Sequence, residues 1–301
     1  YFTPSGISAG YNISYSSYDT ANNNTARYTA ETFLFDAIVG VPLSETTSVQ
    51  GILGWDDTQL TTTLGSTPAP LIQYLEDTLG DQPFYPCFYG DADSDPNTPD
   101  VEVCGFNQDW PITTYRFSSG WSKDTRNDFL LPTAGTYNRV ALEFSIPGSS
   151  IDYYKLSYVF EYYKPLLSWL VLKSSVDLGY GDSYGNTSEG LPFWKNFYAG
   201  GPQSVRGFEA NTLGPSYGSC VPVAPETTCI PSYLQPLGGA VKVAGSFEFL
   251  FPRLFSKARG TRLSAFVDYG NVFAGSMRDI YQNYTNPLTG AVFNDDKFSF
   301  D

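Results

Sequence analysis

The chain has 301 residues, of which 17% are aromatic, and a formal net charge of −14 at neutral pH. This acidity argues against a nucleic-acid partner, which would require a basic face. No histidine occurs anywhere in the sequence, so Ser-His and Cys-His catalysis and histidine-ligated metals are excluded. We therefore predict no enzyme, no metal site and no cofactor.

The first 110 residues predict three strands and one helix. Alternation of apolar and polar residues, with turn residues between the segments, indicates strands at 6–18, 27–41 and 48–60. A long polar connection follows from 60 to 110. Within it Leu71, Leu75 and Leu79 recur every four residues after Pro70, which predicts a short amphipathic helix that caps the end of the sheet.

The rest of the chain predicts further strands, each with one apolar and one charged face. They lie at 139–145, 154–162, 170–178, 241–251 and 262–269. In the fourth of them, for example, Val243, Phe247 and Phe249 alternate with Ser246 and Glu248. A second long connection, from 181 to 239, separates the third from the fourth.

Two architectures fit this pattern, a soluble β-sandwich and a transmembrane β-barrel. The turns near Pro42, Pro147 and Lys164 are short, whereas the connections at 60–110 and 181–239 are long. Membrane barrels carry their long loops on one side and aromatic girdles near the strand ends. No apolar run approaches the roughly 18 residues of a membrane-spanning helix. We therefore predict an all-β fold, a transmembrane antiparallel β-barrel with long extracellular loops, and assign residues 1–301 to one domain.

The second long connection opens with a glycine-rich and aromatic segment at 196–208, Asn-Phe-Tyr-Ala-Gly-Gly-Pro-Gln-Ser-Val-Arg-Gly-Phe. A buried arginine in such a segment requires carboxylate or aromatic partners. If the odd positions of 241–251 face lipid, Glu248 points inward, and on the next strand Phe266 and Asp268 do the same. The parity therefore makes both acids and the ring available to Arg206.

The four cysteines form two local pairs in Pro-, Gly- or Asp-rich stretches that we predict to be loops: Cys87 with Cys104 and Cys220 with Cys229. Short-range pairs in loops suggest disulfides and an oxidising compartment. Each would stabilise the fold by about 3 kcal/mol in the chain-entropy model. A zinc site built from all four cysteines is the less favoured alternative, since neither pair has CxxC spacing.

An acidic segment, Asp91-Ala-Asp-Ser-Asp95 with Glu102, mimics the ligand spacing of an EF-hand calcium loop. Pro96 occupies the position that needs glycine, and no helices flank the segment. We interpret it as an acidic surface loop, with weak calcium binding as the alternative.

The motif Val205-Arg206-Gly207-Phe208 resembles the sixth extracellular loop of the BamA family of outer-membrane protein assembly factors from Gram-negative bacteria. The flanking segments Asn196–Gly201 and Asn211–Pro215 share the resemblance. Other similar segments are Tyr1-Phe-Thr3, the stretch from Asp124 to Gly135, Ile146-Pro-Gly148, Gly179-Tyr-Gly-Asp182, Ser246-Phe-Glu-Phe249 and Phe266-Val-Asp-Tyr-Gly270. The resemblance extends over nearly the whole chain and is loosest at 60–110.

The resemblance implies about ten strands of a barrel of about 16 strands, with the periplasmic POTRA domains and the first and last strands absent. The chain begins at Tyr1 without Met and ends at Asp301 within an alternating pattern, so we expect a fragment. The resemblance further implies that Arg206 folds into the lumen against Glu248, Phe266 and Asp268, and that a local disulfide joins Cys220 and Cys229.

The implied function is the folding and insertion of β-barrel proteins into the outer membrane, as the core of the BAM complex. The implied partners are unfolded outer-membrane proteins, accessory lipoproteins that bind the POTRA region, periplasmic chaperones and outer-membrane lipid. Two alternatives stay open: a related polypeptide-exporting barrel, such as a two-partner secretion transporter or a TamA-like factor, and a passive porin.

Overall fold

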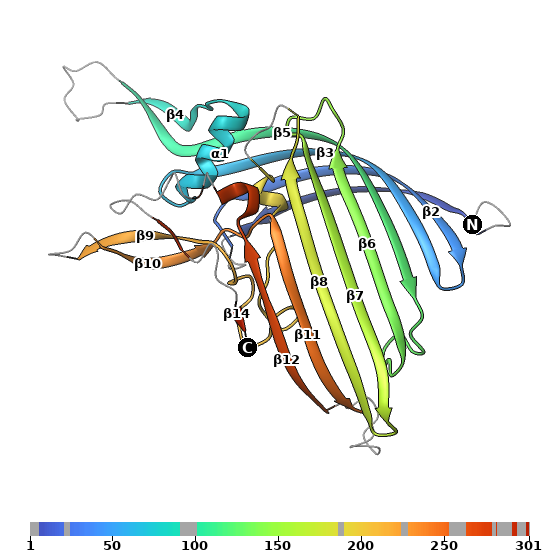
Figure 1. The fold of residues 1–301 in the computed structure, drawn as a ribbon. Helices are drawn as coiled ribbons and strands as arrows, with labels where there is room; N and C mark the ends of the chain where they lie inside the picture. The colour runs from blue at the N-terminus through green and yellow to red at the C-terminus, as the bar shows by residue number, and fades with distance from the viewer. Residues whose placement is uncertain are drawn as a thin grey trace.

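The structure is a computed structural model that describes residues 6–20, 25–90, 101–185, 190–223, 228–252, 263–278, 281, 291–293 and 299–300. Its main element is an 11-stranded sheet in which consecutive strands are neighbours and pair antiparallel (Figure 1). The strands along the sheet are β1 (Ser8–Asp19), β2 (Thr29–Ser44), β3 (Thr47–Thr63), β5 (Val101–Asp124), β6 (Gly135–Ser145), β7 (Tyr153–Leu167), β8 (Leu170–Ser183), β11 (Val241–Phe251), β12 (Leu263–Phe273) and β14 (Ser299–Phe300). β4 (Phe84–Gly90) pairs with β5 off this path.

The sheet forms a curved wall, and within the described residues its two end strands, β1 and β14, do not pair with each other (Figure 1). A smaller sheet of β10 (Thr228–Pro236), β9 (Ser216–Val223) and β13 (Ala291–Phe293) projects from one end. Among the residues described, no helix is long and apolar enough to cross a membrane.

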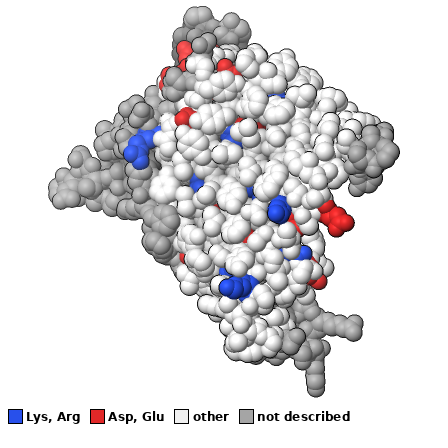
Figure 2. Space-filling view, turned by 45° about the vertical axis from the view of Figure 1, so that its right-hand side comes forward, with Lys and Arg blue, Asp and Glu red and all other residues white. Residues whose placement is uncertain are grey.

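The two faces of the wall differ in polarity, as the strand alternation predicts. Large apolar side chains are exposed on one face, including Tyr11 (74%), Phe247 (51%) and Val267 (59%). Asp36 and Glu248, on the opposite face, are buried. Figure 2 shows one side of the molecule, on which charged side chains are few and scattered. The wall therefore has an apolar outer face suited to lipid and a polar inner face, which we call the lumenal face.

The long connections leave the wall at one end. The connection between β3 and β5 carries α1 (Ala69–Leu79) and β4, and the connection between β8 and β11 carries β9 and β10 (Figure 1). The short turn near Pro147 also lies at this end, because the backbone N–H of Ser150 donates to the Thr113 carbonyl at 2.8 Å. Loop length alone therefore does not assign each turn to its side of the barrel.

The predicted helix is confirmed as α1. Pro70 lies in its first turn, where the missing N–H of proline costs nothing, and Leu71, Tyr74 and Leu75 are fully buried. They pack into a hydrophobic cluster that covers the long-connection end of the wall. Its buried members are Ala26, Leu60, Leu71, Tyr74, Leu75, Trp110, Ile112, Ile151, Phe193, Leu237, Ala274, Met277 and Tyr281. The helix contributes to this cap, as expected.

The prediction that the cysteines lie in loops is wrong. Cys87 and Cys104 lie in β4 and β5 and are direct partners in the register, while Cys220 and Cys229 lie in β9 and β10. Both hairpins extend beyond the wall. Proline and glycine do not end the strands there, because edge strands tolerate these residues. The direct opposition of Cys87 and Cys104 gives a Cα separation of about 4.5–5.5 Å, which a disulfide spans, whereas Cys220 is opposite Pro231 and Cys229 is opposite Pro222. Both disulfides stay predictions, and the segment 91–100 of the candidate calcium loop lies outside the described residues.

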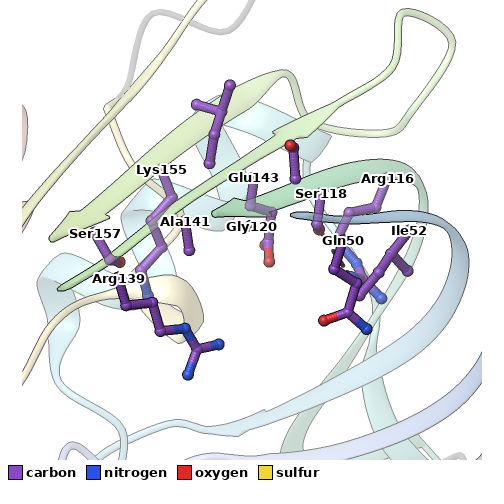
Figure 3. Close-up of a pocket in the computed structure, with 12 residues that line it drawn as sticks. Gln50, Ile52, Arg116, Ser118, Gly120, Arg139, Ala141, Glu143, Lys155 and Ser157 are labelled. Carbon is purple, nitrogen blue, oxygen red and sulfur yellow. Dashed lines mark hydrogen bonds between the residues drawn. The ribbon is translucent and has the colours of Figure 1, made fainter. Parts of the chain in front are cut away.

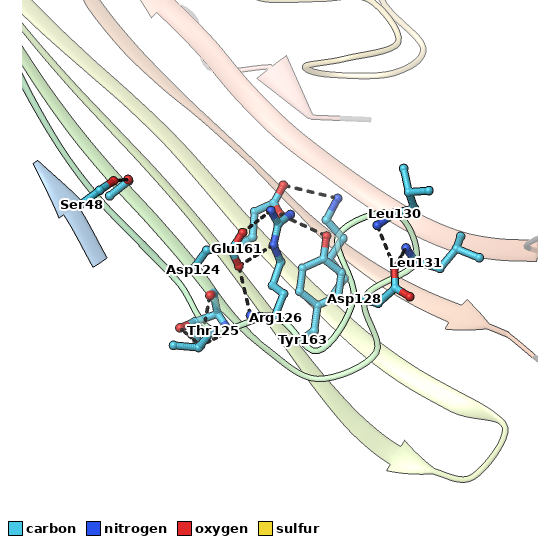
Figure 4. A network of polar contacts seen from close by, with 12 residues as sticks. Ser48, Asp124, Thr125, Arg126, Asp128, Leu130, Leu131, Glu161 and Tyr163 are labelled. Atoms are coloured by element: carbon cyan, nitrogen blue, oxygen red, sulfur yellow. Dashed lines mark hydrogen bonds and ion pairs between the residues drawn. The ribbon is translucent and has the colours of Figure 1, made fainter. Parts of the chain in front are cut away.

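The connection between β5 and β6 is fixed at the opposite end of the wall (Figure 4). Arg126 pairs with Asp124 at 2.7 Å and reaches Glu161 of β7 at 3.2 Å. Asp128 Oδ1 accepts hydrogen bonds from the backbone N–H groups of Leu130 and Leu131 at 2.8 and 2.9 Å. The pair with Glu161 holds the connection against the lumenal face, and the Asp128 bonds close a turn within the connection.

A second ion-paired arginine joins three strands on the lumenal face. Arg116 of β5 contacts Asp36 of β2 at 2.7 Å and Asp56 of β3 at 3.1 Å, and the three side chains are only 9–11% exposed. Gly54 provides the space, because a Cβ there would lie 2.6 Å from the Asp36 carboxylate. We call this group the Arg116 triad.

Replacing Arg116 by Leu would leave two buried carboxylates without a cation. We expect the free energy of unfolding to fall by about 3–5 kcal/mol, measured through the temperature at which the barrel loses its SDS-resistant gel mobility. Adding Asp36→Asn and Asp56→Asn should recover part of the loss, since the uncompensated charges are then removed. A single variant as heat-resistant as the wild type would contradict a stabilising role.

Candidate functional site: a loop held on the lumenal face

The segment 196–208 folds back on itself through three glycines. Gly200, Gly201 and Gly207 have φ angles of 106°, 90° and 92°, which side chains with a Cβ rarely adopt. A Cβ on Gly200 would also lie 2.5 Å from the Glu209 carbonyl oxygen. The backbone N–H of Gly201 donates to the Phe208 carbonyl at 3.0 Å, which closes the turn.

The turn packs its apolar side chains against the wall. Val205 is fully buried with Ala199, Leu213, Ala244 of β11 and Val272 of β12, and Phe208 packs at the edge of this group. The packing fixes the backbone on both sides of Arg206, so the arginine side chain projects from a rigid turn.

Arg206 makes its principal contact with Asp268 of β12, whose side chain is fully buried. The Arg206 Nε and Nη2 atoms donate to the two carboxylate oxygens at 2.7 Å each, and the Arg206 backbone N–H donates to Oδ2 at 2.9 Å. Such a two-point guanidinium–carboxylate pair combines charge with fixed geometry. One carboxylate therefore holds both the backbone and the side chain of the loop.

Three further wall residues surround the guanidinium. Nη2 donates to Ser246 Oγ at 3.0 Å, Nη1 lies 3.5 Å from Glu248, and the guanidinium carbon lies 3.4 Å from the centre of the Phe266 ring. Ser246 is the register partner of Asp268, and Glu248 is the partner of Phe266. The four wall residues thus form two adjacent rungs on the lumenal face.

The structure therefore brings together Arg206, Glu248, Phe266 and Asp268, the four residues that strand parity and the family resemblance had placed near one another. The contacts of Arg206 with the two carboxylates differ in strength. Asp268 accepts three close hydrogen bonds, whereas Glu248 makes one contact at the limit of hydrogen bonding. Ser246 was missed as a partner, although its inward parity is the same as that of Glu248. The four cysteines lie in β4, β5, β9 and β10, whereas the wall partners of Arg206 lie in β11 and β12.

A second attachment of the loop was not predicted. Lys195 pairs with Glu143 of β6 at 3.1 Å, and the Tyr153 hydroxyl donates to the same carboxylate at 2.7 Å. The Lys155 ammonium of β7 donates to the Lys195 carbonyl at 2.6 Å and lies 4.2 Å from the centre of the Phe197 ring. The loop is thus held on β6 and β7 as well as on β11 and β12.

Asn196 ties the start of the segment to the cap. Its Nδ2 donates to the Leu237 carbonyl at 3.0 Å and to the Tyr281 hydroxyl at 3.3 Å. Burial raises the pKa of Tyr281 above its usual range, so the hydroxyl stays neutral.

Between the two attachments, two glycines of β8 make room for the loop. A Cβ on Gly179 would lie 2.5 Å from the Phe197 ring, and one on Gly181 would lie 2.8 Å from Leu191. The sequence Gly179-Tyr-Gly-Asp182 suggested a family resemblance but not this packing, because the partners lie ten or more residues away along the chain.

An apolar outer face, a polar lumenal face and a long connection folded onto that lumenal face define an outer-membrane β-barrel. A model of the Omp85 superfamily domain matches residues 1–292, and the chain belongs to this superfamily. Its location is the outer membrane of Gram-negative bacteria, and the family is non-enzymatic. Both agree with the sequence predictions.

The chain is 30% identical to the outer membrane protein assembly factor BamA of Neisseria meningitidis serogroup B over 98% of its own length. It spans 33% of the length of that relative. The fold is similar to the crystal structure of BamA from Haemophilus ducreyi lacking POTRA domains 1–3, with a TM-score of 0.74 and 24% identity, over 96% of this chain and 51% of that one. These comparisons confirm the BamA resemblance and the barrel fold.

Arg206→Ala should release the loop, so we expect faster limited proteolysis near Val205.

Asp268→Asn should lower the free energy of unfolding by about 1.5–3 kcal/mol, since it weakens charged hydrogen bonds. Glu248→Gln should cost less than about 1 kcal/mol, because its one contact is long and the guanidinium is partly exposed. Proteolysis rates and SDS-resistance temperatures measure the two effects. Equal effects of the two carboxylate variants would contradict the ranking.

Gly179→Val should force Phe197 out of its place and cost about 1–3 kcal/mol through overpacking. The matched control is Gly51→Val, because a Cβ on Gly51 meets no atom within 4 Å. We expect loop proteolysis to accelerate in the Gly179 variant only. If both variants behave alike, the glycine does not serve to accommodate the loop.

Proposed function

We propose that this barrel segment belongs to a protein that catalyses the folding and insertion of β-barrel proteins into the outer membrane, as the core of the BAM complex. The similarity to BamA of Neisseria meningitidis over 98% of the chain supports the proposal. The observation that carries it is the attachment of one loop to a continuous part of the wall. A passive channel needs no such firmly held loop.

The attachment bears on mechanism because it spans five neighbouring strands. Glu143 lies on β6, Lys155 on β7, Gly179 on β8, Glu248 on β11 and Asp268 on β12. A loop bound across all five restrains them to move as one body. Any opening of the barrel is then directed to strands that the loop does not bind.

In this proposal no covalent chemistry takes place. An open seam in the complete barrel would offer an unpaired strand edge to an incoming chain, and pairing there satisfies backbone groups that lipid cannot. The role of Val205, Arg206, Gly207 and Phe208 is to latch the loop, with Glu248, Phe266 and Asp268 as its wall partners. The seam itself is not assigned to residues of this chain.

The partners proposed are unfolded outer-membrane β-barrel proteins as substrates, periplasmic chaperones that deliver them, and accessory lipoproteins that bind the POTRA region. Outer-membrane lipid contacts the apolar outer face. The runner-up function is a polypeptide-exporting barrel of the same superfamily, since 30% identity does not separate these roles.

The test is the folding of an unrelated unfolded barrel protein into liposomes that contain the full-length protein. We expect folding about ten-fold faster than into empty liposomes, equivalent to a barrier lowered by about 1.4 kcal/mol. Asp268→Asn should reduce the acceleration, and Gly51→Val should not. Secretion of an unfolded passenger without any acceleration would favour the exporter, and steady ion conductance without acceleration would favour a porin.

A further inference from the structure

The lumenal face carries a hollow of about 340 Å³ away from the Arg206 site (Figure 3). It lies over β3, β5, β6 and β7, and its volume is near the lower end of small-molecule pockets, about 300–1,000 Å³. The polar residues around it include Gln50, Arg116, Ser118, Arg139, Glu143 and Ser157, and Lys155 lines it as well. We call it the lumenal hollow.

Most charges of the lumenal hollow are already compensated. Arg116 is paired with two carboxylates, Asp36 and Asp56, in the Arg116 triad. The carboxylate of Glu143 receives Lys195 at 3.1 Å and the Tyr153 hydroxyl at 2.7 Å. Neither Arg116 nor Glu143 is therefore available to balance another charge.

Two cations have no carboxylate partner. Arg139 is exposed, and within the described part of the chain its guanidinium makes no ion pair and no hydrogen bond. Figure 3 shows this group directed into the open space of the hollow. Lys155 contacts a backbone carbonyl and an aromatic ring, but among the described residues no carboxylate. The Arg139 guanidinium is thus the charge directed into the hollow, whereas the Lys155 ammonium, on the same wall, is bonded to the loop and attracted by Glu143.

Neutral donors complete the wall of the hollow. Within the described residues, the side chains of Gln50 and Ser157 make no hydrogen bond, and both line the space. Arginine offers a fork of N–H groups that matches an oxyanion, and lysine offers a point charge.

We propose that the lumenal hollow binds a phosphate monoester. A phosphate monoester carries a charge of about −1.5 to −2 at pH 7 and three acceptor oxygens, so the Arg139 fork can bind two oxygens and the neutral donors Gln50 and Ser157 the third. A carboxylate has only two oxygens, so it would leave the neutral donors unsatisfied. The phosphate can belong to a small soluble molecule or to a lipid headgroup that enters the barrel, and the chemistry of the contacts is the same.

The test measures binding of glycerol phosphate to the full-length protein in a phosphate-free sugar detergent, by calorimetry or by ³¹P NMR. We expect saturable binding that weakens as salt is added. Arg139→Gln should weaken it at least ten-fold, and Arg139→Lys should recover part of the affinity, because it restores the charge without the fork.

The matched control is Lys164→Gln, which removes one exposed cation remote from the lumenal hollow and should leave the affinity unchanged. Retained SDS resistance shows that each variant is folded. Absence of saturable binding in every format, or equal binding by wild type and Arg139→Gln, would overturn the proposal.

A second format distinguishes the two sources of the phosphate. The protein is placed in neutral lipid bilayers with a small fraction of phosphatidic acid, and the bound lipid is counted by native mass spectrometry. Binding of free glycerol phosphate supports a soluble ligand. Retention of phosphatidic acid alone, lost in Arg139→Gln, supports a lipid headgroup.

Discussion

The buried carboxylate of Asp268 is the constraint on which the held loop depends. A charge with no access to solvent is costly unless it is paired and hydrogen-bonded, and here the ion-pair partner is a single residue of a distant loop. The loop and the wall are therefore stable only together. Removing the loop leaves Asp268 as an uncompensated buried charge. Removing Asp268 leaves the glycine-rich turn without its principal partner.

Around this pair the wall is shaped to receive the loop. Glycines on β8 recess the lumenal face below Phe197 and Leu191, and polar residues of β6 and β7 hold Lys195. The ion pairs at two places fix where the loop lies along the wall. The close packing between them fixes its distance from the wall. The Arg116 triad fastens β2, β3 and β5 separately, so the two halves of the wall are held by different devices.

Strand alternation predicted much of this arrangement. Because side chains alternate strictly along a strand, the inward direction of Glu248, Phe266 and Asp268 follows once one apolar residue is placed against lipid. The helix at Leu71 and Leu75 followed in the same way from its period. The sequence could not rank Asp268 above Glu248, because that difference depends on the register between two strands and on where the loop backbone lies.

Other features were beyond prediction because they depend on tertiary packing. The Lys195–Glu143 contact joins residues 52 positions apart, and no local pattern indicates it. The cysteine-bearing stretches looked like loops from their Pro and Gly content, but they form strands because a neighbouring strand supplies backbone partners. The family resemblance located Arg206 more surely than composition did, whereas it gave no indication of the Arg116 triad.

The recess in β8 also bears on how this barrel can evolve. Gly179 and Gly181 face the loop with no space for another atom, whereas their neighbours Leu178 and Tyr180 are exposed on the outer face. Lipid accepts almost any apolar side chain, but the loop accepts none in place of the glycines. We therefore expect substitution at Gly179 and Gly181 to be restricted, whereas Leu178 and Tyr180 should tolerate exchange for other apolar residues.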